Sequence, residues 1–589
     1  MTARTAPLRV ANCSGFFGDR PSAARELLDG ADFDVLTGDW LAELTMLILA
    51  RQRAKNPAAG YARTFLTMLE DVLGTCVQRG IPIVANAGGL NPAGCATAVS
   101  ALAARLGLSV TVGSVDGDDL LPKVPDLLAA GRLSSLSGDA LHLSGPALVA
   151  NAYLGGWGIA SCLSRGANVV VTGRVTDAAL TIGPAAWAFD WARDDWDALA
   201  GALVAGHIIE CGAQATGGNY SFADRDAPGM TRPGFPIAEI NPDGSSVITK
   251  PRGSDGVVNR DTVTAQLLYE VGPARYLNPD VTARLDTIEL VDDGPDRVLV
   301  RGVRGEPPPE RLKVSLAVDG GFRNAMMLGI TGTDPVGKAR LAEREIWDQI
   351  PGGRYAFEEV SVELLGRPAD DMAGQPAATC LLRIAVAGTD RALVGRTFSS
   401  AVIATGLSSY AGLYTAGPPS DATSFARYVP ALVPADACAV TATVGESVVS
   451  IEHTPGRPSH ADVVSAPRTL VATPVARVPL ARLIGARSGD KGGDANVGVW
   501  CSHDAVYAWL ESYLDVARMR ELLPETAGLT ITRHPLPNLR AINFVIERFL
   551  GDGVASCLRF DAQAKGLAEY LRSRVVDVPT NLVTFEVQP

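Results

Sequence analysis

Several features that mark common protein classes are missing from this chain. No apolar run approaches the ~18 residues of a membrane-spanning helix. The N-terminus, MTARTAPLRVANCSG, has no apolar stretch after its basic residues of the kind that a secretory signal carries. The nine cysteines include no C-x-x-C pair, which argues against a zinc site and against a disulfide framework. These absences predict a cytoplasmic protein that does not bind a membrane.

Histidine and positive charge are also scarce. The chain has six histidines, no H-E-x-x-H pair and a formal net charge of −12, which disfavours a zinc hydrolase and a nucleic-acid partner. It lacks G-x-G-x-x-G, G-x-x-x-x-G-K-[ST] and G-x-S-x-G, so we expect no dinucleotide site, P-loop or nucleophile elbow. No cofactor is predicted. Mg²⁺ or Mn²⁺ held by aspartate-rich loops stays open as an alternative.

The residues that are present predict a folded protein of several parts. Apolar residues make up 47% of the 589 and charged residues 20%, which is typical of globular domains. Residues 1–215 alternate short Val- and Ile-rich runs with helical patterns. This alternation predicts an α/β core with a mostly parallel, doubly wound sheet. Residues 216–455 carry more Gly-Pro punctuation and successive strand-like runs, so we expect a mixed α+β extension that completes an N-terminal domain, 1–455.

A second domain is expected after a proline-rich stretch. Residues 454–474 hold four prolines and no clear period, which predicts a linker at 456–474. Residues 475–589 read as a compact α+β unit. The simplest arrangement for it is a small, mostly antiparallel sheet with two helices on one face.

Four predicted strand ends of the core carry polar side chains and glycines. Ligands of open parallel sheets collect at the carboxyl ends of strands. Glycine lets a ligand approach the backbone, and an arginine supplies a fixed, forked charge. The predicted substrate-binding residues here are Asn12, Ser14, Asp19, Asn86, Gly88, Gly89, Thr172, Arg174 and Asp177. Asp39 is a predicted catalytic carboxylate, with Glu43 as a second carboxylate nearby. Helix capping is the alternative role for residues such as Asn91 and Asp177.

A further candidate lies in GHIIECGAQATGGNYSFAD, residues 206–224. Glu210 ends an apolar segment, where burial raises a carboxyl pKa and suits an acid or base. Cys211 could be a nucleophile only with His207 as its base, and a small buried cysteine is the favoured interpretation. Glu210 is therefore preferred over Cys211 as a catalytic residue. Asn219, after two glycines, is a predicted substrate-binding residue.

The stretch ARSGDKGGDANVGVW, residues 486–500, holds the densest group of charges and glycines. We expect it between the first two strands of the C-terminal unit, where no helix dipole follows to bind an anion. Two roles stay open. Asp490, Lys491 and Asp494 could form an ion-pair network that docks the domains, or the loop could place Asp490 and Lys491 against substrate as catalytic residues.

Eight motifs in order resemble the acyclic terpene utilisation family of AtuA-like proteins. They are VANCSGFFGDR, LTGDWLAELTM, ANAGGLNP, VVTGRVTDAALTIGP, IIECGAQATGGNYSF, GFPIAEI, ARSGDKGGDANVGVW and LPNLRAINFVIERFLGDGVASCLRFDAQAKGLAEYL. The resemblance implies an N-terminal α/β domain and a C-terminal ferredoxin-like domain. It also implies a place beside acyl-CoA carboxylases, enoyl-CoA hydratases and acyl-CoA dehydrogenases that degrade branched or terpenoid acids. The chain departs from the family at DAQAK, where Ala564 occupies a position usually held by glycine.

These observations lead to one preferred function and two alternatives. The preferred function is a catabolic enzyme for a branched or terpenoid acyl-CoA, or a related organic acid, with hydratase- or lyase-type acid–base chemistry. The alternatives are a non-catalytic accessory partner of an acyl-CoA carboxylase or hydratase pathway, and a Mg- or Mn-assisted hydrolase or lyase. A homo-oligomer is expected from the resemblance, and acyl-CoA carboxylase pathway proteins are candidate partners. Clustering of Asp39, Arg174 and Glu210 would favour the enzyme over the accessory protein.

Overall fold

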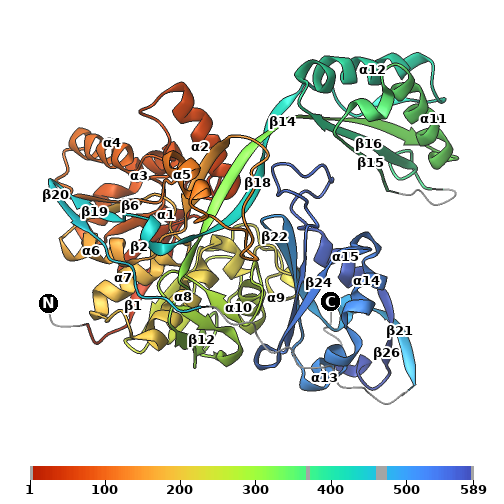
Figure 1. Cartoon of the computed structure of the whole chain (residues 1–589). Coiled ribbons are helices and arrows are strands. Elements are labelled where there is room, and N and C mark those ends of the chain that lie inside the picture. Colours follow the sequence, from red (N-terminus) through yellow and green to blue (C-terminus); the bar gives the residue numbers. More distant parts are fainter. Residues whose placement is uncertain (1–3, 367–371, 459–473, 586–589) are drawn as a thin grey trace.

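The N-terminal domain is built on one large mixed sheet (Figure 1). The computed structural model describes residues 4–366, 372–458 and 474–585, so most of the predicted linker 456–474 lies outside the described residues. Strands run in the order β11-β12-β8-β7-β1-β2-β3-β6-β4-β19-β20. The five central strands are parallel: β1 (Leu8–Asn12), β2 (Val35–Gly38), β3 (Ile83–Ala85), β6 (Val169–Thr172) and β4 (Val112–Asp116).

Helices cover both faces of this parallel centre because successive side chains of a strand point to opposite faces. Val10 and Val84 belong to one apolar core, while their neighbours Ala11 and Ala85 belong to another. The first core includes α6 (Trp157–Ser164), α7 (Ala179–Phe189) and α8 (Trp196–Ile209). The second includes α1 (Ala23–Gly30), α3 (Arg63–Arg79) and α4 (Pro92–Arg105). The remaining early helices are α2 (Glu43–Lys55) and α5 (Val124–Ala129).

The predicted parallel sheet is present in residues 1–215, but the sheet as a whole is mixed. Antiparallel strands extend it at both edges, and all of them come from the segment that the sequence assigned to a mixed extension. Beside β1 lie β7 (Ile237–Ile240), β8 (Ser246–Thr249), β12 (Val298–Arg301) and β11 (Glu289–Asp292). Beside β4 lie β19 (Thr441–Val444) and β20 (Ser447–Ser450). The extension therefore completes the first sheet instead of packing on it.

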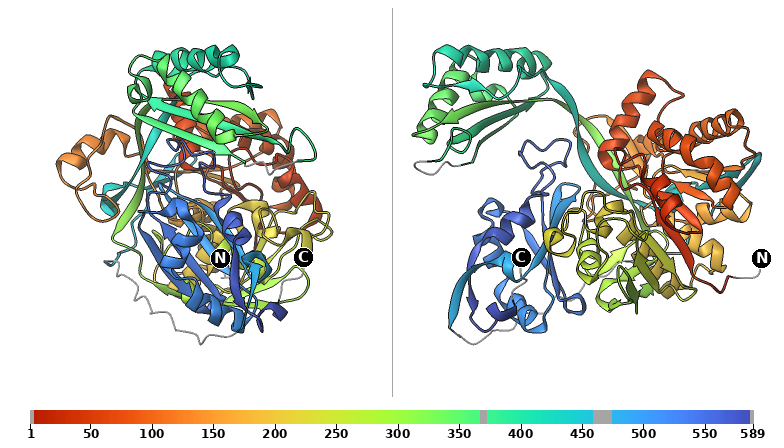
Figure 2. Two further views of the ribbon diagram at one scale, coloured as in Figure 1. Left: turned by 90° about the vertical axis from the view of Figure 1, so that its right-hand side faces the viewer. Right: turned by 180° about the vertical axis from the view of Figure 1, so that it is seen from behind.

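Two long strands carry a separate module away from the domain (Figure 2). Residues 311–323 of strand β14 (Arg311–Thr331) pair with β18 (Thr423–Pro434), and β5 (Ala147–Ala152) pairs with the first half of β14. Strand β14 continues past a bulge at Asp319/Gly321. Beyond the bulge, β14 joins β16 (Thr379–Gly388), β15 (Glu359–Leu365) and β17 (Tyr414–Thr415). Helices α11 (Pro335–Asp348) and α12 (Phe398–Ala404) contribute to the core of this module.

The C-terminal domain has a four-stranded antiparallel sheet in the order β22-β23-β25-β24. Its strands are β22 (Gly485–Lys491), β23 (Asp494–Trp500), β24 (Ile531–Leu536) and β25 (Ala541–Ile546), and a separate pair is formed by β21 (Val475–Pro479) and β26 (Val575–Pro579). One apolar core joins the sheet to three helices, one more than predicted: α13 (Asp504–Tyr513), α14 (Val516–Leu522) and α15 (Leu567–Ser573).

The other face of this small sheet docks on the N-terminal domain. In β23, Val497 and Val499 enter the C-terminal core, while Asn496 and Trp500 alternate with them and face the N-terminal domain. A Cβ atom at Gly498 would lie 2.5 Å from Leu268 Cβ, so only glycine allows this approach. The sequence ANVGVW thus encodes one face for a domain core and one for an interface.

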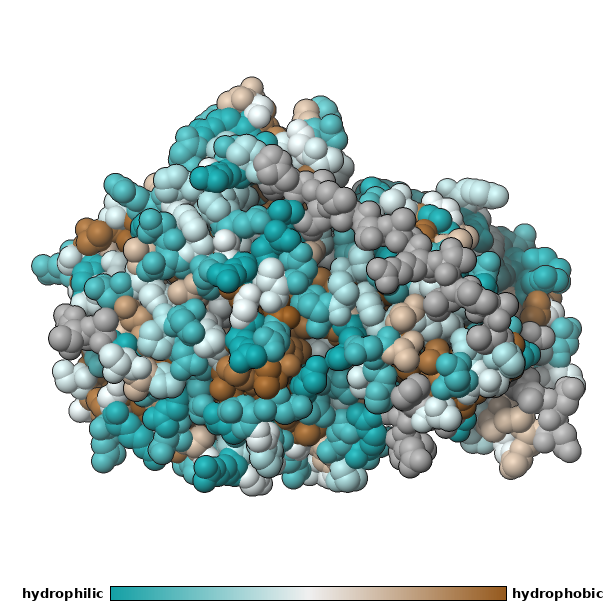
Figure 3. All heavy atoms as spheres, turned by 90° about the horizontal axis from the view of Figure 1, so that it is seen from below, coloured by the Kyte–Doolittle hydropathy of each residue, from teal (hydrophilic) through white to brown (hydrophobic). Residues whose placement is uncertain are grey.

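One face of the molecule shows how polar and apolar side chains are distributed on the surface. The face in Figure 3 is mainly hydrophilic, with apolar side chains in small groups. Among the described residues, no helix has the length and apolar character needed to cross a bilayer.

Candidate functional site

The four predicted loops meet at one edge of the sheet. Asp39 N donates to Ser14 O over 2.9 Å, and Asn86 Nδ2 donates to Asp39 Oδ1 over 2.5 Å, which joins the loops after β1, β2 and β3. Gly88 lies so close to the end of β6 that a Cβ atom there would be 2.5 Å from Thr172 O. The carboxyl ends of neighbouring parallel strands therefore converge, as the sequence predicted.

Most predicted substrate-binding side chains in these loops are used to hold the loops together. The contacts are Ser14 Oγ to Asp39 O (2.9 Å), Gly15 N to Asp19 Oδ2 (2.9 Å), Trp40 N to Asn86 Oδ1 (2.7 Å) and Thr172 Oγ1 to Gly173 O (2.8 Å). Gly89 adopts a left-handed φ of +54° in the turn after β3. These contacts explain the polar composition of the loops, and substrate binding by these residues stays a prediction.

Asn12 links this edge to Glu210, which follows α8. Asn12 Nδ2 donates to Ile209 O (2.7 Å) and Glu210 O (3.0 Å). Glu210 is 8% exposed, and His207 Nδ1 lies 3.2 Å from its Oε1. Its other oxygen, Oε2, makes no hydrogen bond within the described residues. Burial, together with the charges of Asp177 and Glu270, raises the pKa of Glu210 well above its usual range.

Arg174 is the centre of the charged groups on the N-terminal side. Its guanidinium is buried, lies 2.7 Å from Asp177 Oδ1 and stacks 4.4 Å above the Tyr153 ring. Burial opposes its charge, but Asp177 and other anions outweigh burial and raise its pKa well above the usual value. Burial and the charge of Asp177 raise the pKa of Asp39 as well. Asp39 is therefore a buried carboxyl group with a raised pKa beside a permanent cation.

Glu43 and Lys313 complete this side. Tyr153 Oη donates to Glu43 Oε1 over 2.9 Å, and Lys313 Nζ lies 4.9 Å from the centre of the same ring. Burial disfavours ionised Glu43, yet the charges of Lys313 and Arg174 outweigh it and lower the pKa of Glu43. Lys313 in turn stays charged, because Tyr153 and Glu43 raise its pKa against the effect of burial.

The ARSGDKGGDANVGVW stretch is a β-hairpin, and this corrects the prediction of a loop. Residues 485–491 and 494–500 are the strands β22 and β23, joined by Gly492 and Gly493. Gly492 has a φ of +65°, which two-residue hairpin turns require. The two strands pair along their whole length. Small and polar residues alternate in them with residues that face the C-terminal core, which is the pattern of a strand with two different faces.

The hairpin brings Asp490 and Lys491 to the same charged groups. Lys491 Nζ donates to Glu270 O over 2.7 Å, and Asp490 Oδ1 lies 4.0 Å from Lys565 Nζ. Burial and the charge of Glu270 raise the pKa of Asp490 to about 7. Burial and the charge of Lys313 lower the pKa of Lys491 to about 8. Both groups therefore titrate near neutral pH.

The predicted ion-pair network inside the hairpin is absent from the described residues. Lys491 binds a backbone carbonyl, Asp490 faces Lys565, and Asp494 Oδ1 accepts from Arg548 N at 2.8 Å. The hairpin instead docks through hydrogen bonds from its side chains to backbone carbonyls of the N-terminal domain. It both docks the domains and adds two ionisable groups to the site.

We call the assembled group the interdomain charged cluster. Its members share short contacts or shift one another's pKa: Asp39, Glu43, Arg174, Asp177, Glu210, Glu270, Lys313, Asp490, Lys491 and Lys565. Figure 1 shows β22 beside the region of α9 (Ala223–Asp226) and α10 (Arg260–Leu267) in the N-terminal domain, which is where the two sides meet.

Two residues of the GHIIECGAQATGGNYSFAD stretch have other roles. Asn219 is exposed and left-handed, with φ of +52°, and its carbonyl accepts from Arg487 Nη1 at 2.6 Å. This contact joins the domains, and its predicted binding of substrate stays a prediction. Burial and the charge of Glu210 raise the pKa of Cys211 well above its usual value, so the thiol stays protonated.

Glu270 was not predicted, and it lies between the two domains. It has a φ of +58°, a conformation that costs free energy in a residue with a Cβ atom. Asn496 Oδ1 accepts from its backbone N–H at 2.9 Å, and Lys491 binds its carbonyl. The C-terminal domain therefore holds this strained residue from both sides. Glutamate follows Tyr269 with no motif around it, so the sequence offers no signal for its position.

Comparison with models of protein families assigns the chain to a family. A family model described as "Acyclic terpene utilisation family protein AtuA" matches residues 8–444. The chain belongs to this family. A second model, "AtuA ferredoxin-like domain", matches residues 478–577. Comparisons with curated proteins and with solved structures gave no match.

The AtuA ferredoxin-like domain also supplies Lys565, from the DAQAK segment. Ala564 before it has a φ of +54°, the left-handed conformation that favours glycine, and is fully buried. The segment therefore keeps the backbone that glycine suits although alanine is present. Lys565 Nζ donates to Tyr269 Oη, and it also lies 4.5 Å from the centre of that ring. Lys565 was not predicted as a site residue. Its place in the DAQAK motif is the sequence signal that could have identified it.

No ready metal site accompanies the cluster. Within the described parts of the chain, no group of three or more His, Cys, Asp and Glu side chains is arranged to hold a metal ion.

Proposed function

We propose that this AtuA-family protein is an acid–base enzyme of acyclic terpene or branched-acid catabolism. It acts on an acyl-CoA or a related organic acid by adding or eliminating water. One observation carries the proposal: Glu210 is a buried carboxyl group with a strongly raised pKa and an oxygen that has no hydrogen-bond partner among the described residues. A buried carboxyl group with a raised pKa and a free oxygen is suited to give a proton to substrate.

The roles follow from the charges. In elimination, the Asp490 carboxylate removes a proton from the carbon next to the thioester carbonyl, and the electron pair forms the new double bond. Glu210 protonates the departing hydroxyl group, which leaves as water. The cations of Arg174, Lys313 and Lys491 stabilise negative charge on the carbonyl oxygen during proton removal. Hydration is the reverse sequence, with each group in the opposite protonation state.

The burial of these groups supports an enzyme over an accessory protein. Asp39, Arg174 and Glu210 are 5%, 4% and 8% exposed. Burying charges away from water costs free energy, and such groups are usual where their altered pKa values serve a reaction. An accessory protein would gain nothing from holding these groups together.

The proposal is tested by turnover. Purified protein is incubated with a panel of short branched and terpenoid enoyl- and 3-hydroxyacyl-CoAs, and products are followed by mass spectrometry for gain or loss of one water. Thermal shift with the same compounds measures binding independently. We expect product with at least one branched compound. If the panel yields no product and no thermal shift, the accessory role becomes the better explanation.

The pH dependence of kcat/KM should be bell-shaped, with its maximum between about 7 and 8. Asp490 must be ionised to act as base, so activity rises with pH through its pKa of about 7. Lys491 must be protonated to stabilise an anion, so activity falls as pH rises through about 8. Lys491→Arg should keep activity and remove the alkaline fall, because arginine stays charged. An unchanged alkaline limb in this variant would exclude Lys491 as its origin.

A further inference from the structure

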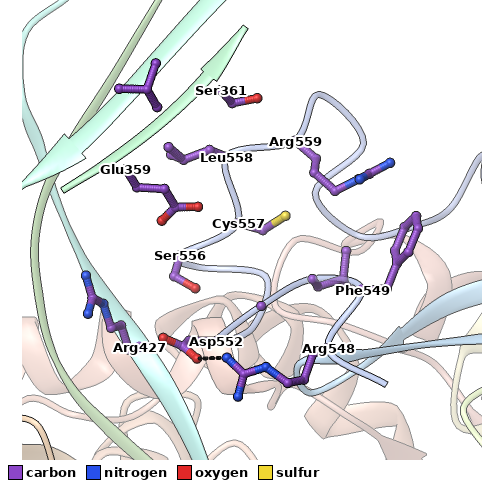
Figure 4. A pocket seen from close by; sticks show the side chains of 13 residues that line it. Glu359, Ser361, Arg427, Arg548, Phe549, Asp552, Ser556, Cys557, Leu558 and Arg559 are labelled. Atoms are coloured by element: carbon purple, nitrogen blue, oxygen red, sulfur yellow. Dashed lines mark ion pairs between the residues drawn. The ribbon is translucent and has the colours of Figure 1, made fainter. Parts of the chain in front are cut away.

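A second site lies between the protruding module and the C-terminal domain (Figure 4). It is a pocket of about 450 Å³, bounded by the start of β15, by β18 and by the loop 548–559 that follows β25. Two hydrogen bonds hold that loop to the module: Arg383 Nη1 to Leu558 O (2.6 Å) and Phe560 N to Glu363 Oε1 (3.1 Å). A pocket of this size accommodates a small organic ligand.

Three arginines line the pocket against two carboxylates. Arg427, Arg548 and Arg559 are lining residues, with Glu359 and Asp552 as the acidic ones, so basic side chains outnumber acidic ones in the lining. In Figure 4 the Arg548 guanidinium turns toward Asp552. Guanidinium groups bind phosphate and carboxylate through paired, charge-assisted hydrogen bonds. The lining is therefore suited to an anion.

The arginines are available to a ligand to different degrees. Arg559 has no ion-pair partner among the described residues, and its guanidinium stacks 4.2 Å above the Phe549 ring, which fixes its orientation. Arg548 lies 3.5 Å from Asp552 Oδ1 with 76% of its side chain exposed, and Arg427 lies 3.3 Å from Glu358 Oε2. Partly exposed ion pairs of this length contribute little free energy, so a phosphate can replace these carboxylates at low cost.

Strand β18 connects this pocket to the interdomain charged cluster. Arg427 and the next residue, Tyr428, point to opposite faces of the strand. Tyr428 N donates to Asp552 O over 2.8 Å, and its ring lies against Gly492 of the hairpin. Burial and the charges of Tyr153 and Glu43 raise the pKa of Tyr428. The two sites thus lie on either side of one strand.

We propose that the arginine-lined pocket binds phosphate groups of a nucleotide-bearing ligand. The inference rests on the proposed function in one respect: the ligand is then the phosphate-bearing end of the acyl-CoA, whose thioester is processed at the cluster. Phosphates supply the several negative charges that three guanidinium groups can pair. A simple fatty acid carries one negative charge and would leave two of them unpaired.

Calorimetric titration of the full chain tests the pocket without turnover. The probes are CoA, adenosine 3′,5′-bisphosphate, and pantetheine, which lacks phosphate. We expect Arg559→Gln and Arg427→Gln to weaken CoA binding by about tenfold to a hundredfold each, the effect of losing a charge-assisted hydrogen bond. Glu359→Gln should tighten CoA binding, because it removes a negative charge from the pocket. Arg344→Gln, an exposed arginine on α11, is the matched control and should bind as the wild type does.

The outcomes separate the pocket from the reaction. Loss of affinity for CoA and for the bisphosphate in the arginine variants, with pantetheine affinity unchanged, supports the pocket even when no acyl-CoA is turned over. Loss of affinity for CoA alone, with bisphosphate affinity unchanged, also supports the pocket. It would show that the pocket recognises the phosphate-bearing end of CoA rather than free nucleotides. CoA affinity that is equal in wild type, Arg559→Gln and Arg427→Gln overturns the pocket, and it does so even when acyl-CoA turnover is found.

Discussion

Replacing Glu210 with glutamine lowers kcat by about 100- to 10,000-fold, the usual contribution of a general acid. Glutamine has the shape of the protonated glutamic acid but cannot give up a proton. The free energy of unfolding at neutral pH should change by less than about 1 kcal/mol, because Oε2 loses no hydrogen bond within the described residues. Steady-state kinetics and urea unfolding of the same preparation measure both effects.

A matched control separates catalysis from burial. Asp280 is 1% exposed, and burial raises its pKa to about 6, but its Oδ2 accepts from Gly156 N at 2.8 Å and it lies outside the cluster. Asp280→Asn should lower stability and leave kcat within about fivefold of wild type. Comparable losses of kcat in Glu210→Gln and Asp280→Asn would show that any buried acid is needed for the fold, and Glu210 would lose its catalytic role.

Replacing Asn543 with leucine should weaken the docking of the C-terminal domain on the N-terminal domain and lower kcat/KM. Asn543 Nδ2 donates to Val271 O (2.8 Å) and Gly272 O (3.0 Å), and its Oδ1 accepts from Asn496. Leucine leaves these buried groups without partners, at a cost of about 3 kcal/mol or more. Asn496 also holds Glu270 in its strained conformation, so kcat/KM should fall by more than about tenfold.

The control for this variant is a buried asparagine in the protruding module. Asn324 is 6% exposed, and its Nδ2 donates to Val394 O (2.9 Å) and Ser399 Oγ (3.1 Å). Asn324→Leu should cost similar stability and leave kcat/KM of the folded protein unchanged. Wild-type kcat/KM in Asn543→Leu, measured where the protein is folded, would contradict the view that docking completes the site.

Local patterns were enough to predict the parallel centre of the fold. Its five strands are short, rich in Val and Ile and separated by helical segments, and each of these features is written in neighbouring residues. The pairing of β7 with β1 depends on contacts between residues more than two hundred positions apart, such as Val10 with Ala238. Periodicity carries no information about such partners, so the mixed character of the sheet could not be predicted.

The residues of the site also fall into those that the sequence could predict and those that it could not. Asp39, Arg174, Glu210, Asp490 and Lys491 stand in glycine-rich or motif-bearing stretches, and the sequence pointed to each of them. Glu270 and Lys313 lie in an ordinary turn and an ordinary strand, and only the docked C-terminal domain and the pairing of β14 bring them to the cluster. Composition shows which residues could do chemistry, whereas tertiary contacts decide which of them meet.

Strand β14 has a consequence for how the chain folds. Its first half places Leu312, Val314 and Leu316 in the N-terminal core, and its second half places Met326 and Leu328 in the core of the module. The strand is completed only when Arg311 lies opposite Pro434, so a large loop must close before either core is finished. The two cores are therefore expected to form late and to lose amide protection together in hydrogen exchange, as one cooperative unit that spans both bodies.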